Sequence, residues 1–456
     1  MIRNKITDRH TRMLTYTILV GILVCFALFT YGRAHIQGDS AQSIRYANAI
    51  LDEHSLFPKE WSYGNGEFYV FNSLPFVVLF CLFIGNKSLA IVLGTLATLL
   101  VAVVSIILVS EKVLKSRCWT LIIPIFLIFL SSPESRYMII YMGAYVMEMT
   151  ALTLVFYFLY RALKSHSIHH LVLHSVFLFI MILGGSRYLA EYTLPALLAF
   201  VFAYYMQIRD KESVSFKADF KYIGKILLYV LLPSLVGFIA YKYLSSTHTM
   251  VGNGIENLVL EDSIEEVFAN ALTAVSSFFA MFGYNGGVSV ASIAGLQSLV
   301  GLVICIIVCF VIPILQAVKI KNESQDTQLY FTFGVAHNLV LFMVAVLCGK
   351  NSERYLLSSA YVWIIISARY LYTYLLDNKK YKAVLWEALF VVAIFVEGAA
   401  LIQSTADSSI GVSSYAKICD ALKEHNLSKG YATYWVGYPV EVYSNNDIKI
   451  GGGSDC

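Results

Sequence analysis

Residues 13–31 read MLTYTILVGILVCFALFTY, an apolar run without a charged side chain. As a helix this run would be about 28 Å long, which is close to the thickness of the hydrocarbon core of a bilayer. Four basic residues precede it within residues 1–12. A secretory signal has a shorter apolar core and then a small-residue cleavage site, whereas Tyr31-Gly32-Arg33 follows here. We therefore expect a retained first membrane span.

Ten further apolar runs indicate a polytopic membrane protein. The chain has 456 residues, of which 58% are hydrophobic and 14% charged, whereas soluble domains have about 25% charged residues. We expect an all-α protein with about eleven transmembrane helices. Besides 13–31, the predicted spans are 88–110, 118–131, 142–161, 171–184, 193–208, 224–244, 292–316, 329–348, 355–373 and 384–402. The net charge of +3 gives no reason to expect a nucleic-acid partner.

The distribution of Lys and Arg predicts the orientation. Six connections expected on the side of the N-terminus carry 19 Lys and Arg, against nine in the connections of the other side, the C-terminal tail left out. Cytoplasmic loops of membrane proteins carry such an excess. The N-terminus is therefore expected in the cytoplasm and the C-terminus outside, in a multi-pass protein of the cell membrane.

Two polar parts lie outside the spans. We expect a transmembrane domain over residues 1–402 with an extracytoplasmic first loop at 32–72, and a small extracytoplasmic α/β domain over 403–456. In the tail, 413–424 has the pattern of an amphipathic helix, and 431–436, 440–443 and 448–450 are strand candidates. Residues 71–84 and 268–282 are apolar and short, which favours helices at the membrane interface. Cys419 and Cys456 could pair in this domain.

Four arginines of the expected outer side are each followed by tyrosine, at Arg45, Arg136, Arg187 and Arg354. One interpretation is anchoring at the interface, where tyrosine concentrates and arginine can extend to the headgroups. The other is phosphate binding, because the guanidinium is a planar fork that matches phosphate. On the second interpretation Tyr188 and Tyr355 are additional donors.

Three outer carboxylates are candidates for chemistry. Asp39 follows the first span closely and could instead cap a helix over 40–51. Glu67 follows the Asn65-Gly66 turn, where an exposed loop carboxylate is the alternative. Glu134 precedes Arg136 and could simply pair with it. The sequence contains no Walker A loop, no dinucleotide-binding glycine fingerprint and no zinc-binding HExxH motif.

The layout resembles the GT-C class of integral-membrane glycosyltransferases. Gly38-Asp39 stands just past the first span, and Leu56-Phe57-Pro58 leads through the Tyr63–Glu67 turn to an interface helix ending at Gly85. The resemblance implies a polyprenyl-phosphate-linked sugar as donor and Asp39 as the general base or the group that orients the acceptor. It also implies Glu134 as the partner acid, although the class more often has aspartate there.

The resemblance extends to the tail and to a metal. Residues 430–435 look like the start of the outer domain of some members of the class. A divalent metal, Mg²⁺ or Mn²⁺, could be held by Asp39 and Glu134, but the sequence does not require one, and we expect no other cofactor.

These observations predict a glycosyltransferase that modifies a cell-surface glycan or lipid at the outer face of the membrane. In this hypothesis Arg45, Glu67, Arg136, Arg187, Tyr188, Arg354 and Tyr355 bind the substrate or its phosphate. Two alternatives stay open. One is a polymerase or ligase of lipid-linked oligosaccharides, and the other is a flippase or transporter of a lipid-linked glycan that catalyses no transfer.

Overall fold

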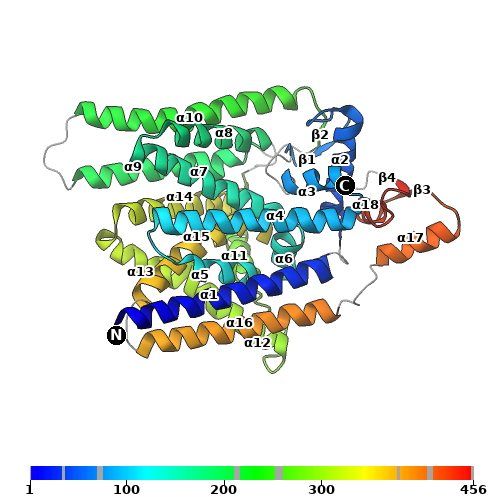
Figure 1. Cartoon of the computed structure of the whole chain (residues 1–456). Coiled ribbons are helices and arrows are strands. Elements are labelled where there is room, and N and C mark those ends of the chain that lie inside the picture. Colours follow the sequence, from blue (N-terminus) through cyan, green and yellow to red (C-terminus); the bar gives the residue numbers. More distant parts are fainter. Residues whose placement is uncertain are drawn as a thin grey trace.

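The chain is mostly helical, and most of its long helices run side by side along one direction (Figure 1). The computed structural model describes residues 2–32, 36–68, 75–209, 216–251, 260–376, 381–407 and 414–452. The α-helices are α1 Ile2–Ala27, α2 Gly38–Glu53, α3 Pro75–Phe83, α4 Lys87–Leu108, α5 Trp119–Pro124, α6 Pro133–Arg136, α7 Ala144–Ser165, α8 Ile168–Gly184, α9 Leu194–Arg209, α10 Phe216–Ser245, α11 Ile264–Met281, α12 Ile293–Cys305, α13 Ile312–Lys319, α14 Gln325–Leu347, α15 Glu353–Leu371, α16 Tyr381–Asp407, α17 Ser414–Glu424 and α18 Tyr434–Tyr443.

Two short parallel strand pairs accompany the helices. Strand β1 (Tyr63–Gly64) pairs with β2 (Met250–Val251), and β3 (Lys429–Ala432) pairs with β4 (Lys449–Gly452). Several helices continue as π-helical turns, namely η1 Leu28–Gly32, η2 Val109–Val113, η3 Ile125–Phe129, η4 Tyr137–Tyr141, η5 Leu189–Thr193, η6 Ile306–Val311 and η8 Tyr372–Leu376, and η7 Ile320–Asn322 is a 3₁₀ turn.

Within the described ranges, seven helices are long and apolar enough to cross a membrane. They are His10–Thr30, Lys87–Val113, Tyr145–Ser165, Tyr222–Ser245, Ile293–Asn322, Gln325–Leu347 and Val384–Gln403. An eighth candidate is the pair Trp119–Phe129 and Pro133–Tyr141, which is bent by 116°. The chain is therefore a multi-pass helical membrane protein, and seven of the eleven predicted spans coincide with these helices.

The estimate of eleven spans is not supported, because the other four predicted spans are helical but do not meet the same test. One of them, 118–131, forms the first half of the bent pair. Helix α8 has 17 residues and reaches only about 25 Å, and the apolar helix at Leu189–Tyr205 is also short. Charged, serine and tyrosine side chains lower the hydropathy of α15. That helix is buried over most of its length, so it needs no apolar face toward lipid.

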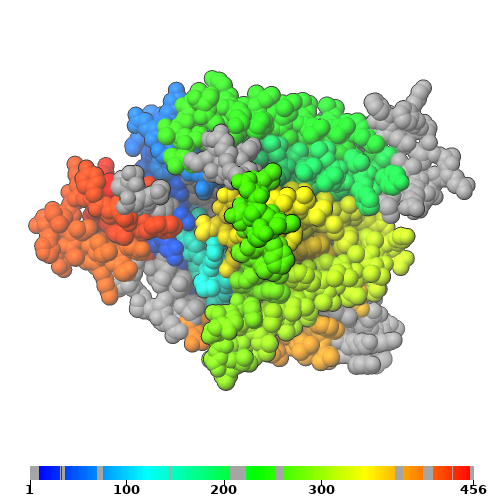
Figure 2. Space-filling model, turned by 180° about the vertical axis from the view of Figure 1, so that it is seen from behind, coloured from blue at the N-terminus to red at the C-terminus, as the bar shows by residue number. Residues whose placement is uncertain are grey.

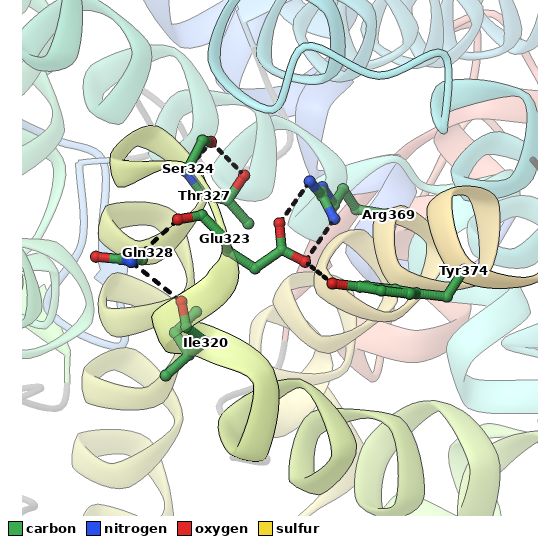
Figure 3. Close-up of polar contacts among 7 residues, drawn as sticks. All are labelled: Ile320, Glu323, Ser324, Thr327, Gln328, Arg369 and Tyr374. Carbon is green, nitrogen blue, oxygen red and sulfur yellow. Dashed lines mark hydrogen bonds and ion pairs between the residues drawn. The ribbon is translucent and has the colours of Figure 1, made fainter.

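At the end of the bundle that holds the N-terminus, ion pairs tie the connections together (Figure 1). The carboxylate of Glu323 accepts hydrogen bonds from Arg369 at 3.0 and 2.7 Å and from the hydroxyl of Tyr374 at 2.8 Å, as Figure 3 shows. Asp326 accepts from Lys164 at 2.7 Å and pairs with Lys115 at 2.9 Å. Connections expected on one side of the membrane thus meet at one end; which side that end faces stays a prediction.

The opposite end carries α2, α3 and the C-terminal elements (Figure 1). Helix α2 begins at Gly38, and its N-terminal cap is Gln37, whose backbone N–H donates to Oγ of Ser40 at 3.1 Å. The alternative role for Asp39, capping a helix over 40–51, was therefore wrong, because Asp39 lies in the first turn of the helix. Arg33 lies outside the described residues.

Both predicted interface segments are helical over most of their described residues, and residues 71–74 of the first lie outside the described ranges. In the segment expected at 71–84, α3 covers Pro75–Phe83. This helix packs so closely on α4 that a Cβ atom added at Gly94 would come within 2.4 Å of the Val77 Cα atom. Helix α11 covers most of the segment expected at 268–282 and packs against α14 and α15. Figure 2 shows it in green on the surface, lying over the yellow part of the chain.

The C-terminal elements pack against α2. The amphipathic helix expected at 413–424 is α17, and the strand expected at 448–450 overlaps β4. Residues 434–443 form helix α18, so the two strands predicted at 431–436 and 440–443 were wrong apart from the overlap with β3. Aromatic and β-branched residues favour strands, but here Val440 and Val442 are buried in a helix, with α18 packed on α2. Cys419 donates from Sγ to the Val440 carbonyl at 3.3 Å, and Cys456 lies outside the described residues.

Candidate functional site

A polar cavity of about 200 Å³ brings together three basic side chains from distant parts of the sequence. Arg187 comes from the turn after α8, Lys350 from the turn after α14 and Arg354 from the first turn of α15. The cavity is lined by Asn65, Gly66, Glu67, Tyr145, Ser186, Arg187, Ala190, Glu191, Leu341, Val344, Lys350, Arg354 and Tyr355. It therefore combines a cationic wall with carboxylates and two tyrosines.

The turn at Asn65-Gly66 places Glu67 in this cavity. Both turn residues have positive φ angles, 59° and 65°, which asparagine and glycine tolerate best. The turn is held by the Tyr241 hydroxyl, which donates to the Gly66 carbonyl at 2.8 Å, and by the Phe68 N–H, which donates to the Gly184 carbonyl at 2.9 Å. Glu67 is 7% exposed. It is thus a buried carboxylate rather than an exposed loop residue.

Arg187 is surrounded by three carboxylates. Its Nε lies 3.0 Å from Oε1 of Glu67, its Nη2 donates to Oε2 of Glu148 at 2.6 Å, and Glu191 lies 3.9 Å away. Burial lowers the pKa of Arg187, but Glu148 and Glu67 outweigh that effect and raise it well above its usual value. The side chain of Arg187 is partly buried, and an arginine in such a setting stays charged and its fork is held in one orientation.

Lys350 and Arg354 complete the cationic wall. Arg354 donates from Nε to Oε1 of Glu134 at 3.0 Å, and its side chain is still 43% exposed. Lys350 has no ion-pair partner within the part of the chain that the structure describes. A cation without an internal partner at a cavity wall is available to an anionic ligand.

Helix α6 connects the first turn of α2 with this cavity. The hydroxyl of Tyr137, directly after α6, donates to Oγ of Ser40 at 3.2 Å, next to Asp39 in α2. Glu134, within α6, reaches Arg354. Asp39 is not among the residues that line the cavity. Of the two predicted catalytic carboxylates, Glu134 pairs with Arg354 of the cavity wall, whereas Asp39 lies in the first turn of α2 and does not line the cavity.

The remaining predicted site residues divide between the cavity and other places. Tyr355 lines the cavity, whereas Tyr188 is 1% exposed and its hydroxyl accepts a hydrogen bond from Arg187 at 3.3 Å. Arg45 pairs with Glu441 at 3.4 Å and lies 4.4 Å from the Tyr438 ring centre, so it joins α2 to α18. Arg136 pairs with Glu397 at 3.5 Å in the bundle. Neither of these two arginines lines the cavity.

Sequence reasoning did not assign Tyr145, Glu148, Glu191 and Lys350 to this site, nor the lining residues Asn65 and Ser186. Glu191 is four residues after Arg187, and Lys350 is four residues before Arg354. Both spacings were a usable signal, because residues close to a singled-out arginine in the same connection tend to face the same space. Tyr145 and Glu148 gave no comparable signal, since α7 reaches the site only through packing.

The described residues contain no group of three His, Cys, Asp or Glu side chains that could hold a metal ion. Asp39 in α2 and Glu134 in α6, named as metal ligands if a metal takes part, belong to no such group. The donors present at the cavity are two arginines and a lysine, which suit an anion rather than a cation.

Comparisons with known proteins add no family assignment. No family model matches the chain, and the search of curated proteins gives no match. Function must therefore be argued from the site itself.

Proposed function

We propose that this protein is a membrane glycosyltransferase that transfers a sugar from a polyprenyl-phosphate donor to a cell-surface glycan or lipid acceptor. The observation that carries the proposal is the convergence of Arg187, Lys350 and Arg354 on one cavity. Three cations around one space suit a phosphate with its negative charges. The cavity belongs to a multi-pass membrane protein, which suits a phosphate that is carried by a membrane lipid.

Sugar transfer requires a base for the acceptor hydroxyl and positive charge for the departing phosphate. The bond between the anomeric carbon and the phosphate oxygen breaks, the acceptor oxygen bonds to that carbon, and the acceptor proton goes to the base. We give Lys350 and Arg354 the role of binding the phosphate, with Arg187 as a fixed third charge. Asp39 is the proposed base, and Glu134, expected as the partner acid, is proposed to position Arg354.

One observation favours the second candidate, a polymerase or ligase of lipid-linked oligosaccharides. Such an enzyme also needs cations for a lipid pyrophosphate. The cavity holds these cations together with Glu67 and Glu191, whereas Asp39 does not line it. In this alternative one of the cavity carboxylates serves as base, and Asp39 is dispensable.

Glycan analysis of cells carrying Asp39→Ala or Arg354→Ala separates these functions. Lys321→Ala is a matched control, because Lys321 is exposed and lies in η7 at the other end of the bundle. Loss of the same sugar in both test variants, with the control normal, is the expected result. Loss only in Arg354→Ala favours the polymerase or ligase.

Normal glycans in both test variants, at normal protein levels, would remove the enzyme proposals. Transport of a fluorescent polyprenyl-phosphate sugar across vesicles that contain the purified protein would then support a flippase.

A further inference from the structure

The Lys350 turn, residues 348–352, joins α14 to α15 and carries one of the three cations of the polar cavity. A lysine side chain is long and flexible, and Lys350 has no ion pair among the described residues that would fix it. Gly349 has a φ of 64°, the left-handed conformation that commonly ends a helix. The position of the Lys350 ammonium therefore depends on how firmly this backbone turn is held.

Helix α11, which lies on the surface of the bundle (Figure 2), presents its polar side chains inward. Its large apolar side chains Ile264, Phe268 and Leu272, four residues apart, are more than half exposed, which suits a helix that contacts lipid. Asn270 and Ser277, seven residues apart and so on one face of the helix, bond to the end of α14 and to the Lys350 turn. The polar face of α11 thus serves the protein rather than the solvent.

Residues 261–270 close the end of α14. The last carbonyl groups of a helix have no N–H partner within the helix. The Glu261 N–H donates to the Leu347 carbonyl at 2.9 Å, and Nδ2 of Asn270 donates to the Val346 carbonyl at 3.4 Å. The same Nδ2 donates to Oε1 of Glu261 at 3.1 Å. The point at which α14 ends and the Lys350 turn begins is therefore set by the segment that leads into α11.

Asn351, directly after Lys350, makes two hydrogen bonds to α11. Its Nδ2 donates to Oδ1 of Asn270 at 2.8 Å, and its carbonyl accepts from Oγ of Ser277 at 2.7 Å. Asn270 is thus bonded on both sides of Lys350, to Val346 in the last turn of α14 and to Asn351. Its amide uses the donor and the acceptor at the same time.

We propose that Asn270 is a positioning residue, which holds the Lys350 turn so that the Lys350 ammonium stays at the wall of the polar cavity. Ordering a backbone segment has an entropy cost. Because α11 holds the turn in the folded protein, this cost falls on folding and not on the binding of an anion. The role of Lys350 in phosphate binding rests on the proposed function, whereas its placement by Asn270 can be measured without a ligand.

Hydrogen exchange of the full chain in nanodiscs tests the placement without a ligand. We expect amide exchange in residues 346–352 to be about threefold to tenfold faster in Asn270→Ala, the effect of lost hydrogen bonds on local opening. Exchange in the buried part of α15, residues 356–366, should stay unchanged. Unchanged exchange in residues 346–352, or the same acceleration in both segments, would overturn the placement.

A double-mutant cycle tests whether Asn270 acts through Lys350. The probe is farnesyl phosphate, a short polyprenyl phosphate, titrated onto the protein in nanodiscs. Asn270→Ala should raise the dissociation constant about threefold to fivefold in the wild type and leave it unchanged in Lys350→Ala, because two residues that act through one contact are not additive. Ser277→Ala, which releases only the Asn351 carbonyl, should show the same dependence on Lys350 and is the milder second variant.

Thr273→Ala is the control, since Thr273 is exposed on the same helix and bonds only within it, to the Ala269 carbonyl. It should change neither exchange nor affinity. Equal weakening by Asn270→Ala in the wild type and in Lys350→Ala would overturn the positioning role, because it would show a general effect on the fold. A wild type without saturable binding of farnesyl phosphate would contradict the proposed function, and hydrogen exchange alone would then decide the placement of Lys350.

Discussion

Arg354 donates from Nε to Oε1 of Glu134 across 3.0 Å and so joins the first turn of α15 to α6. The carboxylate fixes the guanidinium, yet 43% of the arginine side chain stays exposed at the polar cavity. A charge that is oriented but still accessible is what a phosphate site requires. Glu134 therefore has the role of positioning Arg354, and this role does not require Glu134 to take part in catalysis.

Removing Arg354 should weaken the binding of a polyprenyl phosphate to the purified protein. We expect Arg354→Ala to raise the dissociation constant about 10- to 100-fold, because a hydrogen bond between charged groups contributes about 1.5–3 kcal/mol. Arg354→Lys should recover part of the affinity, since lysine keeps the charge but not the fork. Titration of the lipid phosphate in nanodiscs measures both, and unchanged affinity in Arg354→Ala would exclude Arg354 from the site.

Lys350→Ala should weaken the binding of a polyprenyl phosphate about tenfold, which is the effect of one lost charge-assisted contact. The thermal midpoint of unfolding should stay nearly unchanged. The reason for the second expectation is that Lys350 has no ion-pair partner among the described residues, so its removal leaves no buried charge behind. Lys321→Ala, at the other end of the bundle, serves as the control for a general loss of positive charge. A large fall in the midpoint would instead indicate a structural role for Lys350.

The membrane spans could be predicted from the sequence where a helix is long and apolar. Seven predicted spans match long apolar helices, because their hydropathy is high whether the helix is exposed or is covered by other helices. The prediction was weakest for α15 and α8, which are central or short. Helix α15 carries Arg369 and several serines in the core of the bundle, where neighbouring helices rather than lipid cover them. Hydropathy alone cannot distinguish such a helix from a less apolar segment.

The sequence predicted parts of the candidate site only where neighbouring residues determine the local structure. The Asn65-Gly66 turn was predicted from its two residues, and both φ angles confirm it. The three-carboxylate environment of Arg187 was not predicted, because Glu67 and Glu148 lie in different parts of the chain and reach Arg187 only in the fold. Glu148 comes with α7, which packs on α8, and Glu67 comes with the turn that is bonded to Gly184. A single sequence carries no record of such contacts.

Glu353 gives a test that depends on pH. It accepts hydrogen bonds from the hydroxyls of Ser132 and Ser135, and burial, together with the nearby charge of Glu134, raises its pKa above the usual value. A carboxyl with a raised pKa in the folded state favours folding when it is protonated, and this contribution is lost as the pH rises through that pKa. Glu353→Gln removes the titration. Its thermal midpoint relative to the wild type should therefore increase from pH 4.5 to pH 8.

That difference is measured in one detergent at constant ionic strength. Glu265→Gln is a suitable control, since Glu265 is exposed in the first turn of α11. A difference between Glu353→Gln and the wild type that falls with rising pH would show that the hydroxyl donors of Ser132 and Ser135, rather than burial, dominate the environment of Glu353.

Arg187 should be the most sensitive position of the site for stability. Its replacement by alanine leaves Glu67, Glu148 and Glu191 close together without their shared cation. Breaking a buried ion pair by removing one partner costs about 3–5 kcal/mol, so Arg187→Ala should lower the thermal midpoint markedly. The second variant, Arg187→Ala/Glu148→Gln, should regain part of the loss because it removes one of the uncompensated charges. A double variant no more stable than Arg187→Ala would show that Arg187 stabilises the fold through packing against Tyr145 and Tyr188 rather than through charge.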